Sequence, residues 1–164
     1  MSDVESIVRD LQERVARLED QVALYQLMMS YGPSVDSGSS DFAAGLWTDD
    51  GVYDFDNVSD VLAGAPAIKA MVEGPRHQAY IHAGCAHLVG MPYLEIDGDR
   101  AVATGYASLN HFDGDGFRIG RITANRWEFV RMPTGWRVKN RTNRILNGEE
   151  EPRALLRRAV TDPQ

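Results

Sequence analysis

Four histidines are the side chains in this sequence best suited to acid–base or metal chemistry. Three of them, His77, His82 and His87, follow at intervals of five residues, which match neither one face of a helix nor one face of a strand. Catalytic zinc usually takes three protein ligands in a tighter constellation, and Cys85 is the single cysteine. The sequence contains no glycine-rich phosphate loop in its proper context and no His-Glu-x-x-His motif. We therefore expect chemistry that uses neither a metal nor another cofactor.

Two predicted strands carry polar side chains at alternate positions, which puts those side chains on one face of each strand. On the strand expected over 101–112 they are Tyr106, Ser108, Asn110 and Phe112. On the strand expected over 117–131 they are Arg121, Thr123, Asn125 and Trp127. This pattern fits one polar wall of a pocket, and it fits a solvent-exposed polar face equally well. His111 falls on the opposite face of its strand, so we expect it to be structural or exposed.

The helices that must position these strands come first in the chain. Apolar residues recur every three or four positions from Val4 to Tyr25, which predicts a helix over 3–31 that ends at Gly32-Pro33. After it we expect a polar loop over 34–40, a short helix over 41–47, a short strand over 52–55 and a helix over 66–73. Further strands are expected over 87–96, 101–112, 117–131 and 136–145, and a short helix over 152–160. Such segregation is typical of an α+β fold with helices on one face of a curved sheet.

The composition fits one globular domain of ordinary size. The chain has 164 residues, 43% of them apolar and 25% charged, and a formal net charge of −7. An acidic surface repels phosphate backbones, so we do not expect a nucleic-acid partner. No apolar run approaches the ~20 residues that a membrane span needs, and the polar N-terminus does not resemble a signal peptide. We therefore expect a cytoplasmic protein without membrane contact.

Several motifs occur in an order and spacing that are specific as a set. They are Tyr31-Gly-Pro-Ser-Val-Asp36, Leu46-Trp-Thr-Asp-Asp-Gly-Val-Tyr53, His87 ahead of Asp97-Gly-Asp-Arg-Ala-Val102, and Gly135-Trp-Arg-Val-Lys-Asn-Arg141. Over residues 18–146 the sequence thereby resembles the SnoaL-like branch of the nuclear transport factor 2-like (NTF2-like) superfamily. The resemblance implies an α+β cone in which N-terminal helices pack on a curved, mainly antiparallel sheet that encloses a pocket. It implies the fold more firmly than the reaction, because the superfamily holds dehydratases, isomerases, cyclases and non-catalytic binders.

Within that branch the sequence is most similar to scytalone dehydratase, bile acid 7α-dehydratase and lindane dehydrochlorinase, which use a His–Asp dyad inside the cone. The matching residues are His87 and Asp36, so the resemblance implies His87 as the base and Asp36 as the group that fixes its tautomer. Tyr31 matches a pocket tyrosine of the bile acid enzyme, and its phenol is expected to polarise the substrate. The resemblance also implies substrate-binding side chains at Tyr53, Phe55, Asn110, Thr123 and Asn125.

The sequence departs from those dehydratases at two positions. Phe55 stands where scytalone dehydratase has a tyrosine, and Asn110 or Phe112 stands where the family has a second acidic or imidazole group. Because His87 and Asp36 are kept while these positions differ, the sequence supports proton abstraction but does not identify a leaving group. Arg141 and Arg144 are expected to hold acidic residues on the outer sheet rather than to bind substrate.

Two classes of function fit these residues. The first is a cofactor-free lyase of the dehydratase type, acting on a small polycyclic or polyketide-like hydroxy-carbonyl compound, or an isomerase or cyclase that uses the same base. The second is a non-catalytic ligand-binding or assembly protein. Asp36 together with His87 favours the enzyme, because a partner-binding module has no need of that pair. Whether the two side chains meet inside a closed pocket distinguishes the two classes.

The N-terminal helix predicts self-association. We expect residues 1–17 to project, residues 18–146 to form the domain and residues 147–164 to form a tail with a short helix. The apolar stripe from Val4 to Val22 is longer than one small domain can cover, and exposed apolar stripes usually mark interfaces. We expect a homo-oligomer, and a trimer in preference to a dimer because the dehydratases that the chain resembles are trimers.

Overall fold

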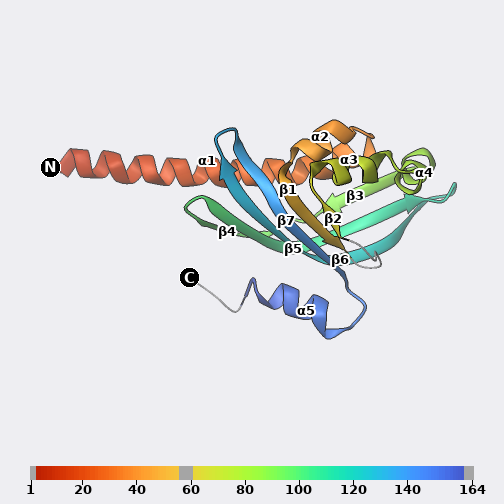
Figure 1. Cartoon of the computed structure of the whole chain (residues 1–164). Helices are drawn as coiled ribbons and strands as arrows, with labels where there is room; N and C mark the ends of the chain where they lie inside the picture. Colours follow the sequence, from red (N-terminus) through yellow and green to blue (C-terminus); the bar gives the residue numbers. More distant parts are fainter. Residues whose placement is uncertain (1–2, 56–60, 161–164) are drawn as a thin grey trace.

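A curved sheet of seven strands carries helices on both of its faces (Figure 1). The computed structural model describes residues 3–55 and 61–160. Within these ranges the elements are α1 (Asp3–Asp36), α2 (Ser40–Gly45), β1 (Trp47–Phe55), β2 (Leu62–Ala63), α3 (Ala65–Glu73), α4 (Pro75–Ala83), β3 (Cys85–Val89), β4 (Tyr93–Asp97), β5 (Arg100–Phe112), β6 (Phe117–Met132), β7 (Gly135–Ile145) and α5 (Glu150–Arg157). The expected α+β architecture is confirmed.

The sheet is mixed. Its strand order is β2-β1-β7-β6-β5-β3, and β4 pairs with β5 as well. All pairs are antiparallel except β1 with β7, which are parallel. The long strands β5, β6 and β7 are joined by tight hairpins, in which Gly114 and Gly135 have positive φ angles.

The core lies between α1 and the face of the sheet that packs against it, which we call the inner face. Helix α1 buries Leu24, Met28, Tyr31 and Val35, and β6 buries Trp127 and Phe129. At Asp20, α1 is held to the β6–β7 hairpin, because the Asp20 carboxylate accepts hydrogen bonds from Arg131 at 2.6 and 2.7 Å and from the Trp136 indole at 2.9 Å.

The part of α1 before Asp20 extends beyond the sheet (Figure 1). Its apolar side chains are exposed: Val4 is 68%, Leu11 49% and Leu18 61% exposed. None of the helices in the described ranges is both long enough and apolar enough to cross a membrane.

Helix α1 is longer than the sequence predicts. Gly32-Pro33 was expected to end it, but the helix continues to Asp36, so the first half of the expected loop over 34–40 is helical. A proline costs a helix one backbone hydrogen bond and its ring crowds the carbonyl four residues earlier, so other contacts must hold the turn that follows it. Here the Ser34 hydroxyl donates to the Tyr31 carbonyl at 2.7 Å, and Val35 is fully buried in the core. Asp36 is therefore held by a helix.

Three other expectations about elements need correction. Strand β1 begins at Trp47, where a helix was expected, and its pairing with β7 is irregular between Trp47 and Val52. The strand expected over 87–96 is two strands, β3 and β4, because Pro92 cannot donate a ladder hydrogen bond. Helix α4 was not expected; it begins at Pro75, a residue suited to the first turn of a helix.

Candidate functional site

Strand register decides which residues face the helices. Opposed residues in an antiparallel pair lie on the same face of the sheet. Leu109 pairs with Arg121 and with His87, and Ala107 pairs with Thr123. On β5, Leu109 shares its face with Ala103, which packs in the core with Met28 of α1, so these residues lie on the inner face.

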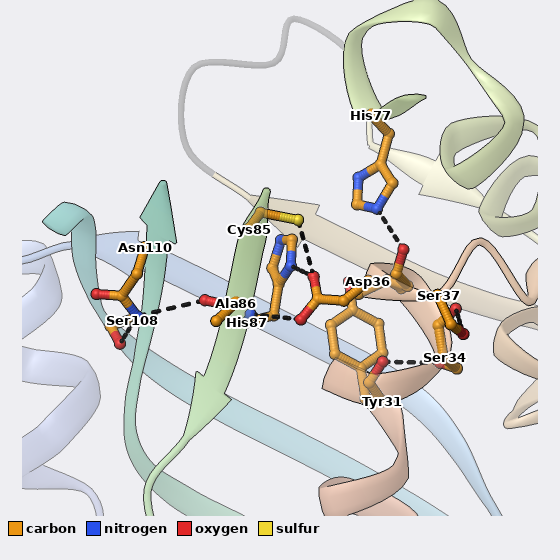
Figure 2. A network of polar contacts seen from close by, with 11 residues as sticks. Tyr31, Ser34, Asp36, Ser37, His77, Cys85, Ala86, His87, Ser108 and Asn110 are labelled. Carbon is orange, nitrogen blue, oxygen red and sulfur yellow. Dashed lines mark hydrogen bonds and ion pairs between the residues drawn. The ribbon is translucent and has the colours of Figure 1, made fainter. Parts of the chain in front are cut away.

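Of the two alternatives for the polar residues of strand β5, the pocket wall is therefore not the one that the structure has. Tyr106, Ser108 and Asn110 lie on the outer face, and the Asn110 side chain donates to the Ala86 carbonyl and to the Ser108 hydroxyl (Figure 2). Alternation along one strand cannot tell which set faces the core, and here the inward set of β5 is the apolar one. Asn110 is thus not placed to bind a substrate in the cone. His111 is on the inner face and its ring packs against Tyr80, with centroids 4.7 Å apart, which contradicts the expectation that it points away.

His87 and Asp36 meet inside the molecule (Figure 2). The His87 ring nitrogen Nδ1 lies 2.5 Å from Asp36 Oδ1, and the His87 backbone N–H donates to Asp36 Oδ2 at 2.7 Å. The side chains are 13% and 21% exposed, respectively. The two residues that the motifs pair are therefore in contact. This contact joins the last turn of α1 to strand β3, two elements that are distant in the sequence.

Close approach of the two backbones makes this contact possible. Gly32 lies directly against strand β3: a Cβ atom at this position would be 2.2 Å from the His87 carbonyl oxygen. Any side chain larger than hydrogen would push the strand away from the helix. Gly32, which was expected only as a helix terminator, therefore sets the distance between Asp36 and His87.

Burial and the mutual hydrogen bonds shift the pKa values of both side chains. Burial lowers the pKa of the His87 imidazole, and the hydrogen bond to Asp36 offsets this only in part, so the ring is neutral at pH 7. Burial also raises the pKa of the Asp36 carboxyl, but the hydrogen bonds from His87 outweigh that effect and keep the pKa below its usual value. The carboxylate accepts the proton on Nδ1, which leaves the lone pair on Nε2 of His87. Nε2 has no hydrogen-bond partner within residues 3–55 and 61–160.

A cavity of about 80 Å³ opens beside the dyad. Its lining includes residues of α1, β1, α3, α4, β3 and β6, namely Tyr31, Tyr53, Phe55, Met71, Arg76, His77, Tyr80, His87 and Arg121. A smaller cavity of about 10 Å³ adjoins it and reaches Thr123, Arg141 and Asn143. The two share Tyr31, Tyr53, His87 and Arg121, so we treat them as the outer and inner parts of one pocket.

Most of the expected site residues line this pocket. Tyr31 and Tyr53 are both 3% exposed and line both parts, Phe55 lines the outer part and Thr123 the inner part. Burial raises the pKa of Tyr31, so its phenol keeps its proton. Asn125 is buried deeper, beneath the pocket, where it donates to Thr123 at 2.7 Å.

Arg141 lies inside the cone, which corrects the expectation that it holds acids on the outer sheet. It is 3% exposed, and its guanidinium carbon lies 4.3, 4.8 and 3.9 Å from the ring centroids of Tyr31, Tyr53 and Trp127. Two of its N–H groups donate to Asn125 Oδ1 at 3.1 and 2.9 Å. Its third nitrogen, Nη1, is buried without a hydrogen-bond partner. Arg144, by contrast, pairs with Asp54 and Glu151 as expected.

Sequence reasoning also missed the position of His77. This residue was considered only as a metal ligand, but its ring stacks on His87 with centroids 5.4 Å apart, and its Nε2 lies 2.9 Å from the Val35 carbonyl oxygen. The backbone carbonyl must accept, so His77 carries its proton on Nε2. His82 is exposed and bonds to the Gln78 carbonyl on its own helix.

Among the described residues, one group of possible metal ligands is close enough to hold an ion: Asp36, Cys85 and His87, whose donor atoms lie within 4.8 Å of one another. These atoms already bond to each other. Burial and the Asp36 carboxylate raise the pKa of the Cys85 thiol to about 12, so the thiol is protonated and donates to Asp36 at 3.2 Å. In this structure the three side chains form a hydrogen-bond network around the carboxylate.

Known proteins share this arrangement of elements. The model of the family described as SnoaL-like domain matches residues 16–142. An NTF2-like protein with a cystatin-like fold from Novosphingobium aromaticivorans is 36% identical, over 90% of this chain and 96% of that one, with a TM-score of 0.87. A comparison with curated protein sequences finds no match.

More distant structures have the same fold. A candidate scytalone dehydratase from Novosphingobium aromaticivorans is 17% identical over 79% of this chain and 85% of its own, with a TM-score of 0.64. A protein from Catenulispora acidiphila, solved in complex with S-DNPA, is 19% identical over 78% of this chain and 94% of its own, with a TM-score of 0.68.

Proposed function

This chain belongs to the SnoaL-like domain family, with an NTF2-like fold, and we propose that it is a cofactor-free lyase of the dehydratase type. The proposed substrate is a small polycyclic or polyketide-like hydroxy-carbonyl compound. One observation carries the proposal: a neutral imidazole, oriented by a partly buried carboxylate, lines a pocket whose inner end holds a guanidinium with one nitrogen, Nη1, that has no hydrogen-bond partner.

The reaction begins with proton abstraction. His87 Nε2 takes a proton from the carbon next to the substrate carbonyl, and the electron pair moves to the carbonyl oxygen as an enolate. Asp36 stabilises the imidazolium that forms. The enolate then re-forms the carbonyl and expels the hydroxyl group from the neighbouring carbon, which leaves as water with the proton that His87 returns. The products are an α,β-unsaturated carbonyl compound and water, and the enzyme is back in its starting state.

Arg141 supplies the charge that this reaction needs. A buried guanidinium without a carboxylate partner, in a site with little water, stabilises negative charge strongly where it develops. Nη1 of Arg141 is available to donate to the enolate oxygen, and the protonated Tyr31 phenol is close to the same guanidinium. Tyr53, Phe55 and Thr123 then shape the walls that hold the ring system.

The direct test is an assay for elimination. Bicyclic β-hydroxy ketones are incubated with the protein in D₂O, and water loss is followed by the ultraviolet absorbance of the conjugated product. We expect conversion above the buffer rate. Deuterium in recovered or rearranged substrate without water loss would instead support an isomerase or cyclase with the same base. Binding without any exchange or conversion would support the non-catalytic alternative.

The pH dependence of kcat/KM should report the protonation of His87. The base must be neutral, so activity rises with pH through the pKa of His87 and is constant above it. Because burial lowers that pKa, we expect the midpoint of the acid limb below pH 6.5. Asp36→Asn removes the partner that raises the pKa, so the limb should move to still lower pH. A limb centred above 6.5 in the wild type would contradict the assignment, and NMR titration of the His87 ring gives an independent measurement.

We also propose that the exposed stripe on α1 contacts a second copy of the chain, in a homo-oligomer that is a trimer in preference to a dimer. Light scattering at micromolar concentration should give a mass above the 18.2 kDa of one chain. Leu11→Glu, which puts a charge on the stripe, should weaken the assembly, as should deletion of residues 1–17. Gln12→Glu adds a charge beside the stripe and should leave the assembly unchanged. A monomeric wild type, or an assembly that neither change alters, would contradict the role of the helix.

A further inference from the structure

The charge of the pocket is opposite to the charge of the protein. The chain has a net charge of −7, yet the described residues that line the two cavities include Arg76, Arg121 and Arg141 and no Asp or Glu. Asp36 lies behind His87, with both oxygens engaged by β3. A ligand in this pocket therefore meets guanidinium groups and neutral side chains.

Arg121 is the guanidinium best placed to meet a ligand. It is partly buried on the inner face of β6, opposite Leu109, and it lines both parts of the pocket. In the described part of the chain it makes no ion pair and no hydrogen bond. Other arginines of the same strand are paired: Arg118 with Asp113, Arg126 with Glu128 and Arg131 with Asp20. The strand thus leaves one guanidinium uncompensated, and that one faces the pocket.

The Arg121 guanidinium, which lines the pocket without an ion-pair partner in the described part of the chain, favours the binding of an anion. Arginine cannot lose its proton at neutral pH, so its charge remains when the pocket is desolvated. Partial burial of a charge without a partner is unfavourable, and an anionic ligand would remove that cost. Arg76 stands at the rim on α4, where it makes a long hydrogen bond of 3.4 Å to the neutral Tyr80 hydroxyl, so its charge adds to the same field.

We propose that the substrate carries a carboxylate, which Arg121 binds while the reacting carbon lies over His87. The proposal rests on the proposed function, because it assumes that this pocket takes the substrate. A carboxylate matches a single guanidinium in charge and in its planar, two-pronged geometry. Arg141 cannot offer two N–H groups to a carboxylate, because Asn125 accepts from Nε and Nη2; only Nη1 remains, for the single reacting oxygen.

A pair of isosteric probes tests the inference without turnover. Calorimetric titrations with 2-naphthoate and the neutral 2-naphthamide, at fixed salt, compare the two affinities. We expect the wild type to bind the carboxylate at least about tenfold more tightly, since one partly desolvated ion pair gives a difference of that order. Arg121→Gln should abolish the preference, and Arg121→Lys should restore part of it. Arg137→Gln removes the same charge from a half-buried position on β7 that does not line the pocket, and it should retain the preference.

Two results would overturn the inference: a wild type that fails to prefer the carboxylate, or a preference that survives Arg121→Gln. The same titrations with His87→Gln separate this inference from the proposed function. If turnover does not depend on His87, the assignment of the base is refuted. If the carboxylate preference nevertheless persists in His87→Gln, the anion site is still supported. Turnover that depends on His87 without a carboxylate preference would refute the anion site alone.

Discussion

Replacing His87 with alanine is expected to lower kcat on a responsive hydroxy ketone by a factor of about 10² to 10⁴, which is the usual contribution of a positioned general base. The substitution removes the Nε2 lone pair that accepts the substrate proton, and neither Tyr31 nor Arg141 can accept a proton in its place. Initial rates of ultraviolet change measure the effect. Circular dichroism establishes that the variant is folded.

Two further variants make this test specific. Asp36→Asn keeps the volume of the side chain but loses the carboxylate that orients the ring and stabilises the imidazolium, so a large loss is expected there too. Combining it with His87→Ala should add little, because both side chains serve one step. His82→Ala, an exposed histidine of α4, should retain wild-type turnover. Wild-type turnover in His87→Ala would refute the assignment of the base.

Gly32→Ala is expected to produce the largest loss of stability for the smallest change in the chain. The new methyl group would overlap the His87 carbonyl oxygen, a backbone atom, so the helix and the strand would have to move apart. Overpacking of this kind usually lowers the free energy of unfolding by about 1–3 kcal/mol. For a chain of this length each kilocalorie lowers Tm by roughly 2–4 °C. Activity should fall as well, since the strand that moves carries His87.

Gly45→Ala is the matched control for this substitution. Gly45 is also helical, and a Cβ atom there would meet nothing within 4 Å. Its thermal melt should equal or slightly exceed that of the wild type, because alanine is the better helix former. A Gly32→Ala variant that melts with the wild type would show that α1 and β3 can separate freely, and would remove the role given to Gly32.

Local patterns predicted the elements whose stability is local. The helix expected over 66–73 and the long strands over 101–112, 117–131 and 136–145 are present within a residue or two. The errors arose where tertiary contacts decide. Helix α1 passes through Pro33 because Val35 is drawn into the core, and Pro92 divides one apolar run into β3 and β4. Neither effect is visible in hydrophobic periodicity.

The same contrast between local patterns and tertiary contacts applies to the residues of the candidate site. Asp36, His87 and Tyr31 were predicted from motifs, and the structure brings them together around one pocket. Arg141 was misplaced, and Asn110 and His111 were assigned to the wrong faces. The direction of a strand side chain depends on which neighbours the strand pairs with, and that pairing joins residues far apart in sequence. Alternation alone allows either face of β5 to be the inner one, and the packing of Ala103 with α1 in the core distinguishes the two.

Two contacts hold α1 to the sheet, and they fix the length of the helix between them but not the length before the first. Asp20 is bound to the β6–β7 hairpin and Asp36 to β3, and both belong to one uninterrupted helix. Each residue added to a helix rotates the remainder of that helix by about 100°. One insertion between these two aspartates would therefore swing Asp36 away from His87 even though every side chain of the pocket was retained. Insertions before Asp20 do not change the rotation of Asp36 relative to Asp20. The projecting part of α1 can therefore vary in length among relatives, whereas the number of residues between the two aspartates is fixed.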